Sequence, residues 1–240
     1  DEVFDCVRGV MRRCMGGYAC VMLINGLGML AFRDPFGIRP LCYGKRKTVF
    51  ADGVGGDGLD DAFDYMAASE SVALDTCGTS GQRFQLERDV APGEAIFVSF
   101  AGILYSQRCH KAPTLTPCLF EYVYFSRPDS IIEGVSVYEA RLNMGEKLAK
   151  RILTEFAKLA ENIDVVMPIP DTSRTSALSC AYRLDRPLRE GFIKNRYIAR
   201  TFIMPGQAMR EKTVRLKLNT IKSEFEGKSV LLVDDSIVRG

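Results

Sequence analysis

Residues Lys228–Gly240 read KSVLLVDDSIVRG, and this stretch decides the fold class of the second half of the chain. Lys228–Val233 is an almost continuous apolar run. Such runs are typical of strands buried on both faces, as in parallel sheets that helices cover. Asp234 and Asp235 follow directly, so we expect their carboxylates at the carboxyl edge of the sheet, where open α/β folds bind ligands.

Two neighbouring acids at such an edge can hold ribose hydroxyls, a magnesium ion, or both. Mg²⁺ prefers one or two carboxylates together with phosphate oxygens and water. The same Asp-Asp-Ser sequence could instead cap the start of a helix. The spacing alone does not decide between these two roles.

The elements before this strand extend the α/β pattern. Ser136-x-x-Glu139 is a capping box that opens a long helix. One face of that helix would carry the apolar residues Met144, Leu148, Ile152, Phe156 and Leu159. A short apolar strand over Asp164–Pro170 and a helix over 173–184 come next. Helix, strand, helix, basic loop and strand, in that order, indicate a doubly wound α/β domain.

The first half of the chain has a different pattern. Helical spacing runs from Val3 to Cys14, and Asn25-Gly26 is a hairpin turn signal between two strand-like runs. The strands expected here are Tyr18–Ile24, Gly28–Arg33, Thr48–Ala51, Tyr65–Ser69 and Ala95–Ser99. Short strands separated by turns predict an antiparallel, β-rich region that ends near Pro117. The expected domains are therefore residues 1–117 and 118–240.

Composition excludes several classes of protein. No apolar run approaches the roughly 20 residues that span a bilayer. The acidic, amphipathic start is not a signal peptide, so we expect a cytoplasmic protein without a membrane partner. The eight cysteines contain no Cys-x-x-Cys pair and are read as reduced thiols. With one histidine, a Cys/His zinc site is not expected.

Charge is distributed unevenly along the chain. The net charge is only +2, yet residues 186–228 hold eleven Lys and Arg against four Asp and Glu. A local basic segment in an otherwise acidic chain favours a small anionic ligand. No nucleic-acid-binding motif accompanies the charge, so phosphates on a small molecule fit better than nucleic acid.

Two further segments could contact phosphates. Pro168–Ala177 (PIPDTSRTSA) offers hydroxyls and backbone N–H groups at a strand-to-helix turn, which suits a pyrophosphate, although simple N-capping would produce the same residues. Gly191–Gln207 (GFIKNRYIARTFIMPGQ) places Lys194, Arg196 and Arg200 in a run without helical or strand periodicity. Such a run is also typical of an ordinary solvated surface.

The motifs together resemble those of amidophosphoribosyltransferases. Val230–Gly240 resembles the signature of type I phosphoribosyltransferases for phosphoribosyl pyrophosphate (PRPP), and LFEYVYFSRPDS (Leu119–Ser130) is characteristic of the amidophosphoribosyltransferase branch. Three segments resemble the glutaminase domain of amidotransferases: FRDPFGIRPL (Phe32–Leu41), ASESVALD (Ala68–Asp75) and APGEAIF (Ala91–Phe97). The resemblance implies the rear part of an Ntn-type glutaminase domain (α+β, antiparallel) followed by a type I phosphoribosyltransferase domain (α/β, mostly parallel sheet), truncated at its carboxyl end.

The resemblance also implies roles for individual residues. Asp234 and Asp235 would bind the ribose of PRPP and take part in a metal site with Thr172. The PRPP contacts implied are Lys194, Tyr197, Arg200, Asp234, Asp235, Ser236, Ile237, Val238, Arg239 and Gly240. The last five of these would begin the loop that grips the 5-phosphate. The glutaminase motifs are expected to support the fold rather than the reaction.

The implied activity belongs to the parent enzyme. It would be a pentosyltransferase and glutamine amidotransferase that moves ammonia from glutamine to PRPP, releases pyrophosphate and begins purine synthesis. The family's nucleophilic cysteine would lie upstream of Asp1, so this fragment alone is expected to be inactive, and Cys6 is no substitute. Alternatives are another PRPP-binding phosphoribosyltransferase or a non-catalytic PRPP-sensing regulator.

Cofactors and partners follow from the same resemblance. Mg²⁺ is the implied cofactor. An iron–sulfur cluster is not expected, because MPGQ (Met204–Gln207) resembles the cluster-free type, although Cys118 matches a possible ligand position. PRPP and glutamine would be substrates, purine nucleotides feedback inhibitors, and the parent a homotetramer.

Overall fold

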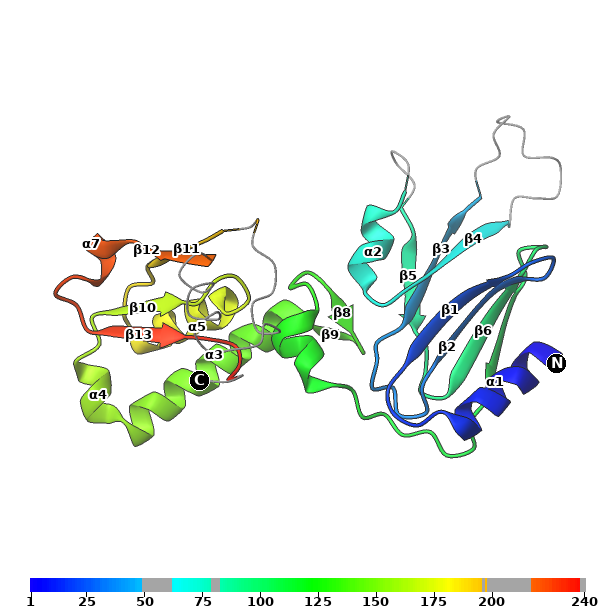
Figure 1. Cartoon of the computed structure of the whole chain (residues 1–240), viewed down its shortest axis with the longest axis horizontal. Coiled ribbons are helices and arrows are strands. Elements are labelled where there is room, and N and C mark those ends of the chain that lie inside the picture. The colour runs from blue at the N-terminus through cyan, green and yellow to red at the C-terminus, as the bar shows by residue number, and fades with distance from the viewer. Residues whose placement is uncertain (49–61, 79–82, 196, 198–216, 238–240) are drawn as a thin grey trace. The chain divides into compact units, whose positions relative to one another are not determined.

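The structure, a computed structural model, describes residues 1–48, 62–78, 83–195, 197 and 217–237. Its contacts divide the chain into two compact units, which are described separately (Figure 1). The first unit contains Asp1–Leu119 and Ser126–Ser136, and the second contains Phe120–Phe125 and Val137–Gly240. The segment that follows Leu119 therefore contributes to both units.

The described part of the first unit is built on two antiparallel sheets. The strand orders are β1 (Ala19–Ile24), β2 (Gly28–Arg33), β6 (Glu94–Ser99), β7 (Leu104–Arg108) in one sheet, and β4 (Phe63–Ala68), β3 (Cys42–Lys47), β5 (Gln85–Asp89) in the other. The predicted hairpin is confirmed, with Ala19 paired to Arg33 and Ile24 to Gly28. Helix α2 (Ser71–Thr76) and the short hairpin β8 (Ile131–Ile132), β9 (Val135–Ser136) complete this unit.

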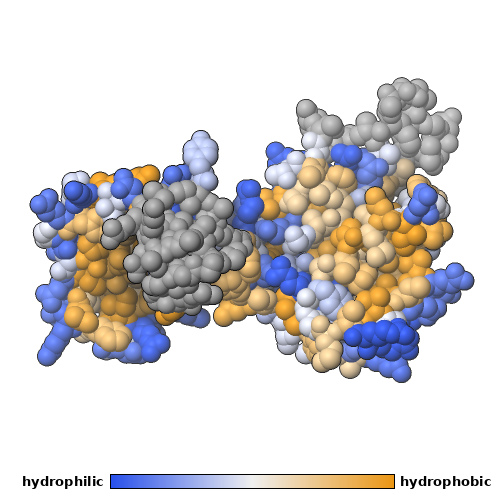
Figure 2. All heavy atoms as spheres, in the orientation of Figure 1, coloured by the Kyte–Doolittle hydropathy of each residue, from blue (hydrophilic) through white to orange (hydrophobic). Residues whose placement is uncertain are grey.

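Two apolar clusters hold the first unit together. Helix α1 (Glu2–Arg13) buries Phe4, Val7 and Met11 against Leu30 and Phe32 of β2. The second cluster joins the two sheets and contains Ala31, Leu41, Tyr43, Val90 and Ile96. Both faces of β2 are therefore covered. Strand β1 is less buried than β2. Figure 2 shows apolar residues on the surface of this unit.

One strand prediction in this unit falls mostly outside the described residues and stays untested. A strand was expected over Thr48–Ala51, but the strand in this region is β3, over Cys42–Lys47, and Thr48 lies just beyond its end. Residues 49–51 are outside the described residues. Strand β3 was not predicted, because the run Lys45–Lys47 is basic rather than apolar. In the structure these side chains form ion pairs with neighbouring strands, such as Lys45 with Glu87 at 3.0 Å.

The second unit has the predicted α/β order. Strands β10 (Val165–Pro168) and β13 (Val230–Val233) pair in parallel, with Val165 opposite Val230 and Pro168 opposite Val233. The other elements are the π-helix η1 (Glu121–Phe125), α3 (Val137–Glu155), α4 (Ala157–Glu161), α5 (Arg174–Leu184), β11 (Phe192–Lys194), β12 (Leu218–Thr220) and α7 (Lys222–Phe225). The expected fold class, antiparallel sheets followed by an α/β unit, is confirmed.

Helix α3 starts directly after Ser136, as the capping box predicts, but its predicted apolar face is only partly correct, because of the predicted residues only Ile152 is among those packed against the core cluster of this unit. The buried positions are Val137, Arg141, Gly145 and Ala149, whereas Leu148 is 39% exposed. The reason is close packing on α5: a Cβ at Gly145 would lie 2.1 Å from the carbonyl oxygen of Ser176. The small residues Gly145 and Ala149 therefore occupy buried positions where large apolar ones were expected.

Phe156 and Leu159, which were expected on the same face, lie beyond the end of α3. Phe156 is the N-cap of α4, and the two side chains are 50% and 65% exposed. Strand β13 also differs from expectation, because Leu232 is 49% exposed although Val233 is buried. Among the described strands β13 pairs with β10 alone, so one of its edges is without a neighbour there. None of the helices in the described ranges has the length and apolar character needed to cross a bilayer.

Candidate functional site

The parallel pairing of β10 with β13 brings two predicted motifs together. Because Pro168 lies opposite Val233, the two strands end side by side. The Ile169 N–H donates a hydrogen bond to the Val233 carbonyl at 2.9 Å and extends the pairing by one step. The loop that leads to α5 and the Asp234–Ile237 segment therefore leave the sheet at the same edge, as the position of the acids predicted.

Three polar side chains form a connected cluster at this edge. The Thr172 hydroxyl donates a hydrogen bond to Asp235 Oδ2, and the Ser236 hydroxyl donates to Asp235 Oδ1 at 2.6 Å. Ser173 is fully buried, and its hydroxyl donates to the Ile169 carbonyl, which fixes the loop before α5. The peptide bond between Pro170 and Asp171 is cis. The structure thus brings Thr172 to Asp235, 63 residues away in the sequence.

Asp234 sits beside this cluster in a different environment. Its Oδ1 accepts a hydrogen bond from the Asp235 backbone N–H at 2.8 Å. Desolvation by the surrounding protein is the main influence on this carboxyl and raises its pKa above the ordinary value of 3.8. The backbone hydrogen bond opposes the rise, and the negative charge of Asp235 adds to it. A cation near both acids would relieve this unfavourable charge.

Lys194 reaches the same loop from another strand. It is the last residue of β11, and its Nζ lies 2.6 Å from Asp171 Oδ2, one residue before Thr172. The lysine was predicted as a ligand contact, but its carboxylate partner was not. Asp171 also lies 3.5 Å from Nη1 of Arg174, which in turn pairs with Glu190 at 3.0 Å. No sequence signal pointed to this ion cluster.

The remaining predicted contacts are less closely connected to the cluster. Tyr197 is 99% exposed, and its backbone N–H donates to Asn195 Oδ1 at 3.0 Å. Ile237 is also 99% exposed. The other predicted PRPP contacts, Arg200, Val238, Arg239 and Gly240, lie outside the described residues.

The donor set at this edge fits magnesium better than a softer metal. Asp234 and Asp235 supply carboxylate oxygens and Thr172 supplies a hydroxyl oxygen, all hard ligands. Within the described ranges no group of three or more His, Cys, Asp or Glu side chains could hold a metal. A protein site with only one or two carboxylates suits an ion that takes its other ligands from water and substrate phosphates.

The glutaminase-like motif in the first unit has a structural role. Arg33 is fully buried and donates hydrogen bonds to the carbonyls of Arg39, Val90 and Gly37 and to the Glu133 carboxylate. Asp34, also fully buried, accepts hydrogen bonds from four backbone N–H groups, those of Tyr18, Phe36, Ile38 and Arg39. Cys6 lies within α1, away from this turn in the chain. The motif supports the fold, as expected.

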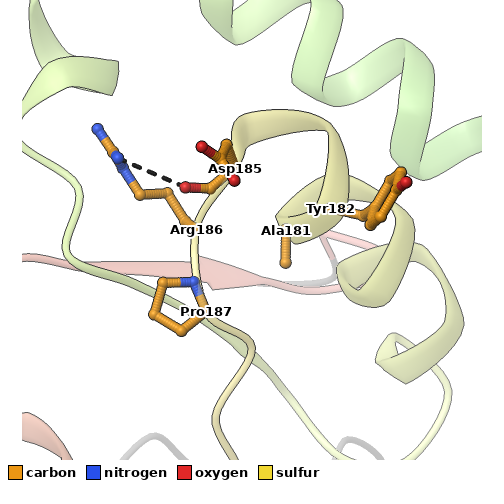
Figure 3. A pocket seen from close by; sticks show the side chains of 5 residues that line it. All are labelled: Ala181, Tyr182, Asp185, Arg186 and Pro187. Carbon is orange, nitrogen blue, oxygen red and sulfur yellow. Dashed lines mark hydrogen bonds between the residues drawn. The ribbon is translucent and has the colours of Figure 1, made fainter.

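The described surface also has shallow hollows away from the strand ends. One, of about 580 Å³, is lined by Ala181, Tyr182, Asp185, Arg186 and Pro187 (Figure 3). It lies at the carboxyl end of α5, whereas Thr172 lies just before the helix begins, about 16 Å away along an 11-residue helix. Tyr182 is 89% exposed, so the hollow is open to solvent. It has no part in the cluster around Asp235.

The geometry defines a class of protein: an α/β unit with acids and hydroxyls at aligned strand ends, in a chain that also contains an antiparallel unit. No family model matches the chain. Curated relatives, however, match it along all 240 residues. It is 56% identical to the amidophosphoribosyltransferase of Haemophilus influenzae and 54% identical to that of Escherichia coli, and it spans 44% of the length of each.

Solved structures agree with this result. A structure described as glutamine phosphoribosylpyrophosphate (PRPP) amidotransferase from B. subtilis complexed with ADP and GMP matches 98% of the chain, with a TM-score of 0.73 and 36% identity, over 45% of its own length. Another, described as the structure of the allosteric regulatory enzyme of purine biosynthesis, has a TM-score of 0.74 and 37% identity. The chain belongs to the amidophosphoribosyltransferase family, as its motifs predicted.

Proposed function

We propose that this chain is part of an enzyme that transfers ammonia from glutamine to PRPP, releasing pyrophosphate and forming 5-phosphoribosylamine, the first committed step of purine synthesis. The observation that carries the proposal is the junction of Thr172, Asp235 and Ser236 at the aligned ends of two parallel strands. In this proposal residues 118–240 form the PRPP-binding part, and residues 1–117 belong to the glutaminase part.

The acids hold the ribose. Asp234 and Asp235 accept hydrogen bonds from its hydroxyls, and Thr172 completes a Mg²⁺ site with them. When bound, Mg²⁺ supplies positive charge that stabilises the pyrophosphate leaving group. Ser236 and the residues up to Gly240 begin the loop for the 5-phosphate. Ser236 already donates a hydrogen bond to Asp235, so the ribose and phosphate contacts are built on adjacent residues.

The cations act on the leaving group. Lys194, Tyr197 and Arg200 contact the pyrophosphate as it departs from C1 of PRPP. This reaction requires little proton transfer from the protein, because its barrier lies in charge separation at an oxocarbenium-like carbon. Positioning the ribose and neutralising the leaving group are therefore the main contributions of these residues.

The remaining features of the parent protein rest on the family. Its glutaminase reaction uses a cysteine nucleophile that residues 1–240 do not supply. Purine nucleotides as feedback inhibitors, a homotetrameric assembly and a cytoplasmic location are part of the proposal. The B. subtilis relative, whose structure is described as a complex with ADP and GMP, supports the nucleotide part.

Isothermal titration calorimetry with PRPP and Mg²⁺ tests the ligand. We expect the 240-residue chain to bind weakly and Asp234→Ala to lower the affinity by about tenfold or more, as expected for loss of a charged hydrogen-bond acceptor. Asp75→Ala, an exposed acid on α2, is the control and should bind like the wild type. Equal affinity of Asp234→Ala and wild type would contradict the proposed site. Glutamine hydrolysis by this polypeptide would contradict the expectation that residues 1–240 do not supply the glutaminase nucleophile.

A further inference from the structure

Four charged side chains form an ion cluster beside the Thr172–Asp235–Ser236 junction. Asp171 contacts two cations, Lys194 at 2.6 Å and Arg174 at 3.5 Å, and Arg174 contacts Glu190 at 3.0 Å. The shortest of these contacts joins Lys194, a predicted ligand contact, to a carboxylate of the same chain. Two acids balance two bases, so the cluster as a whole is neutral.

The fold explains why Lys194 meets Asp171. The segment after α5 runs parallel to β10: Leu188 forms a bridge to Val166, and the Arg189 N–H donates to the Val166 carbonyl at 3.0 Å. Because the two segments run in the same direction, residues five or six positions further along reach the same edge of the sheet. Asp171 and Lys194 are those residues.

Gly191 allows the two segments to lie this close. A Cβ at position 191 would lie 2.4 Å from the Met167 sulfur and 2.7 Å from the Phe225 ring. The Gly191 carbonyl also accepts a hydrogen bond from the Ile221 N–H at 2.9 Å, so the start of β11 is held from a second side. These backbone contacts therefore place Lys194 close to Asp171, and the ion pair does not depend on the reach of the lysine side chain alone.

We propose that Asp171 holds Lys194 as an intramolecular substitute for the pyrophosphate group of PRPP, and that this carboxylate thereby lowers the affinity of the site for its ligand. The proposal rests on the proposed function, because it names the regulation of the same site. Before Lys194 can contact an incoming phosphate, its ammonium must leave or share the Asp171 carboxylate. PRPP thus competes for Lys194 with the Asp171 carboxylate, which belongs to the same chain and is always present.

The Lys194–Asp171 pair is suited to exchange rather than permanent burial. The lysine side chain is 30% exposed and the aspartate side chain 46% exposed. Partly exposed ion pairs are weak, so a ligand with several negative charges can displace the carboxylate. Arg174 remains close to Asp171 and can balance its charge after the lysine has left, which keeps the cost of exchange low.

The affinity test uses two matched charge removals in the 240-residue chain, Asp171→Asn and Glu190→Gln, titrated with inorganic pyrophosphate and with PRPP, each with Mg²⁺. Asp171→Asn should tighten binding by about two- to fivefold, the range that a partly exposed ion pair supports. Glu190→Gln removes the same charge from the partner of Arg174 and should tighten binding by less. In a Lys194→Met background, Asp171→Asn should have little effect. Circular dichroism confirms that each variant is folded.

A second readout needs no ligand. The Lys194 amine should be acylated faster in Asp171→Asn than in the wild type, and Glu190→Gln should leave its rate unchanged. Equal tightening by Asp171→Asn and Glu190→Gln, tightening that persists in Lys194→Met, or an unchanged acylation rate would each overturn the inference. A wild type that binds neither pyrophosphate nor PRPP, with the acylation result as expected, would instead overturn the proposed function on which the inference rests.

Discussion

Both units place an aspartate directly after a strand, yet the two carboxylates are used in different ways. Asp34 follows β2, is fully buried and accepts hydrogen bonds from four backbone N–H groups, three in the turn that follows it and one at Tyr18. Asp235 follows Asp234 at the end of β13, and the hydrogen bonds it accepts come from two hydroxyls. A backbone N–H cannot leave without unfolding the turn, whereas a hydroxyl can rotate toward a ligand. The partners of an acid, more than its sequence motif, separate a structural role from a binding role.

The largest effect expected from this comparison is on stability in the first unit. Asp34→Ala leaves four partly buried N–H groups without their fully buried acceptor and should lower the free energy of unfolding by about 3–5 kcal/mol. Urea denaturation measures the loss. Alkylation of Cys42 reports this unit specifically, because burial raises the pKa of its thiol to about 12 and keeps it unreactive while the unit is folded.

The control for this prediction is Asp75→Ala, which removes an exposed acid in the same unit and should change stability by less than about 0.5 kcal/mol. An Asp34→Ala variant as stable as this control would show that the turn does not depend on the carboxylate. The contrast between a structural Asp34 and a ligand-binding Asp235 would then no longer hold.

A smaller effect is expected from two helical glycines, one in each unit. Gly145→Ala drives a Cβ to 2.1 Å from the Ser176 carbonyl oxygen and should destabilise the second unit by about 1–3 kcal/mol. Gly9→Ala in α1 meets only the end of the flexible Arg13 side chain, at 3.3 Å, and should stabilise the first unit by up to about 1 kcal/mol. Urea denaturation of both variants measures whether each substitution raises or lowers the free energy of unfolding. A Gly145→Ala variant at least as stable as the wild type would contradict the close α3–α5 packing.

The smallest effect concerns the pKa of Asp234, which lies above 3.8 because of desolvation and the nearby Asp235 charge. Asp235→Asn should lower that pKa by removing the like charge, as followed by NMR titration of the carboxyl carbon. The raised pKa means that this carboxyl favours the folded state below pH 3.8 and that the contribution is lost as the pH rises through its folded value. Mg²⁺ binding should have the opposite pH dependence: it should weaken as the pH falls and Asp234 is protonated. A higher pKa in Asp235→Asn would contradict this electrostatic account.

Local patterns predicted those parts of the fold that local interactions determine. The hairpin around Asn25-Gly26, the parallel run at Val230–Val233 and the start of α3 after Ser136 were all recognisable, because turn geometry, apolar runs and capping act over a few residues. The buried face of α3 was not recognisable. It depends on the approach of α5 to Gly145, which is a tertiary contact.

The candidate site was predicted in part for the same reason. Asp234 and Asp235 could be placed at the sheet edge from a single strand, and the family motif added Thr172. The ion pair between Asp171 and Lys194 joins residues 23 positions apart and depends on the parallel course of the segment at Leu188. No short motif encodes that course, so the charge of Lys194 was visible in the sequence but its partner was not.

The most direct test of the central claim is NMR mapping of backbone amide shifts while PRPP and Mg²⁺ are added to the 240-residue chain. The predicted result is a set of shifted signals from Thr172, Lys194 and Asp234–Ile237, with the signals of Phe32–Leu41 unchanged. Shifts concentrated in Phe32–Leu41, or none in Asp234–Ile237 under conditions where calorimetry detects binding, would contradict the assignment of binding to the second unit and of structure to the first.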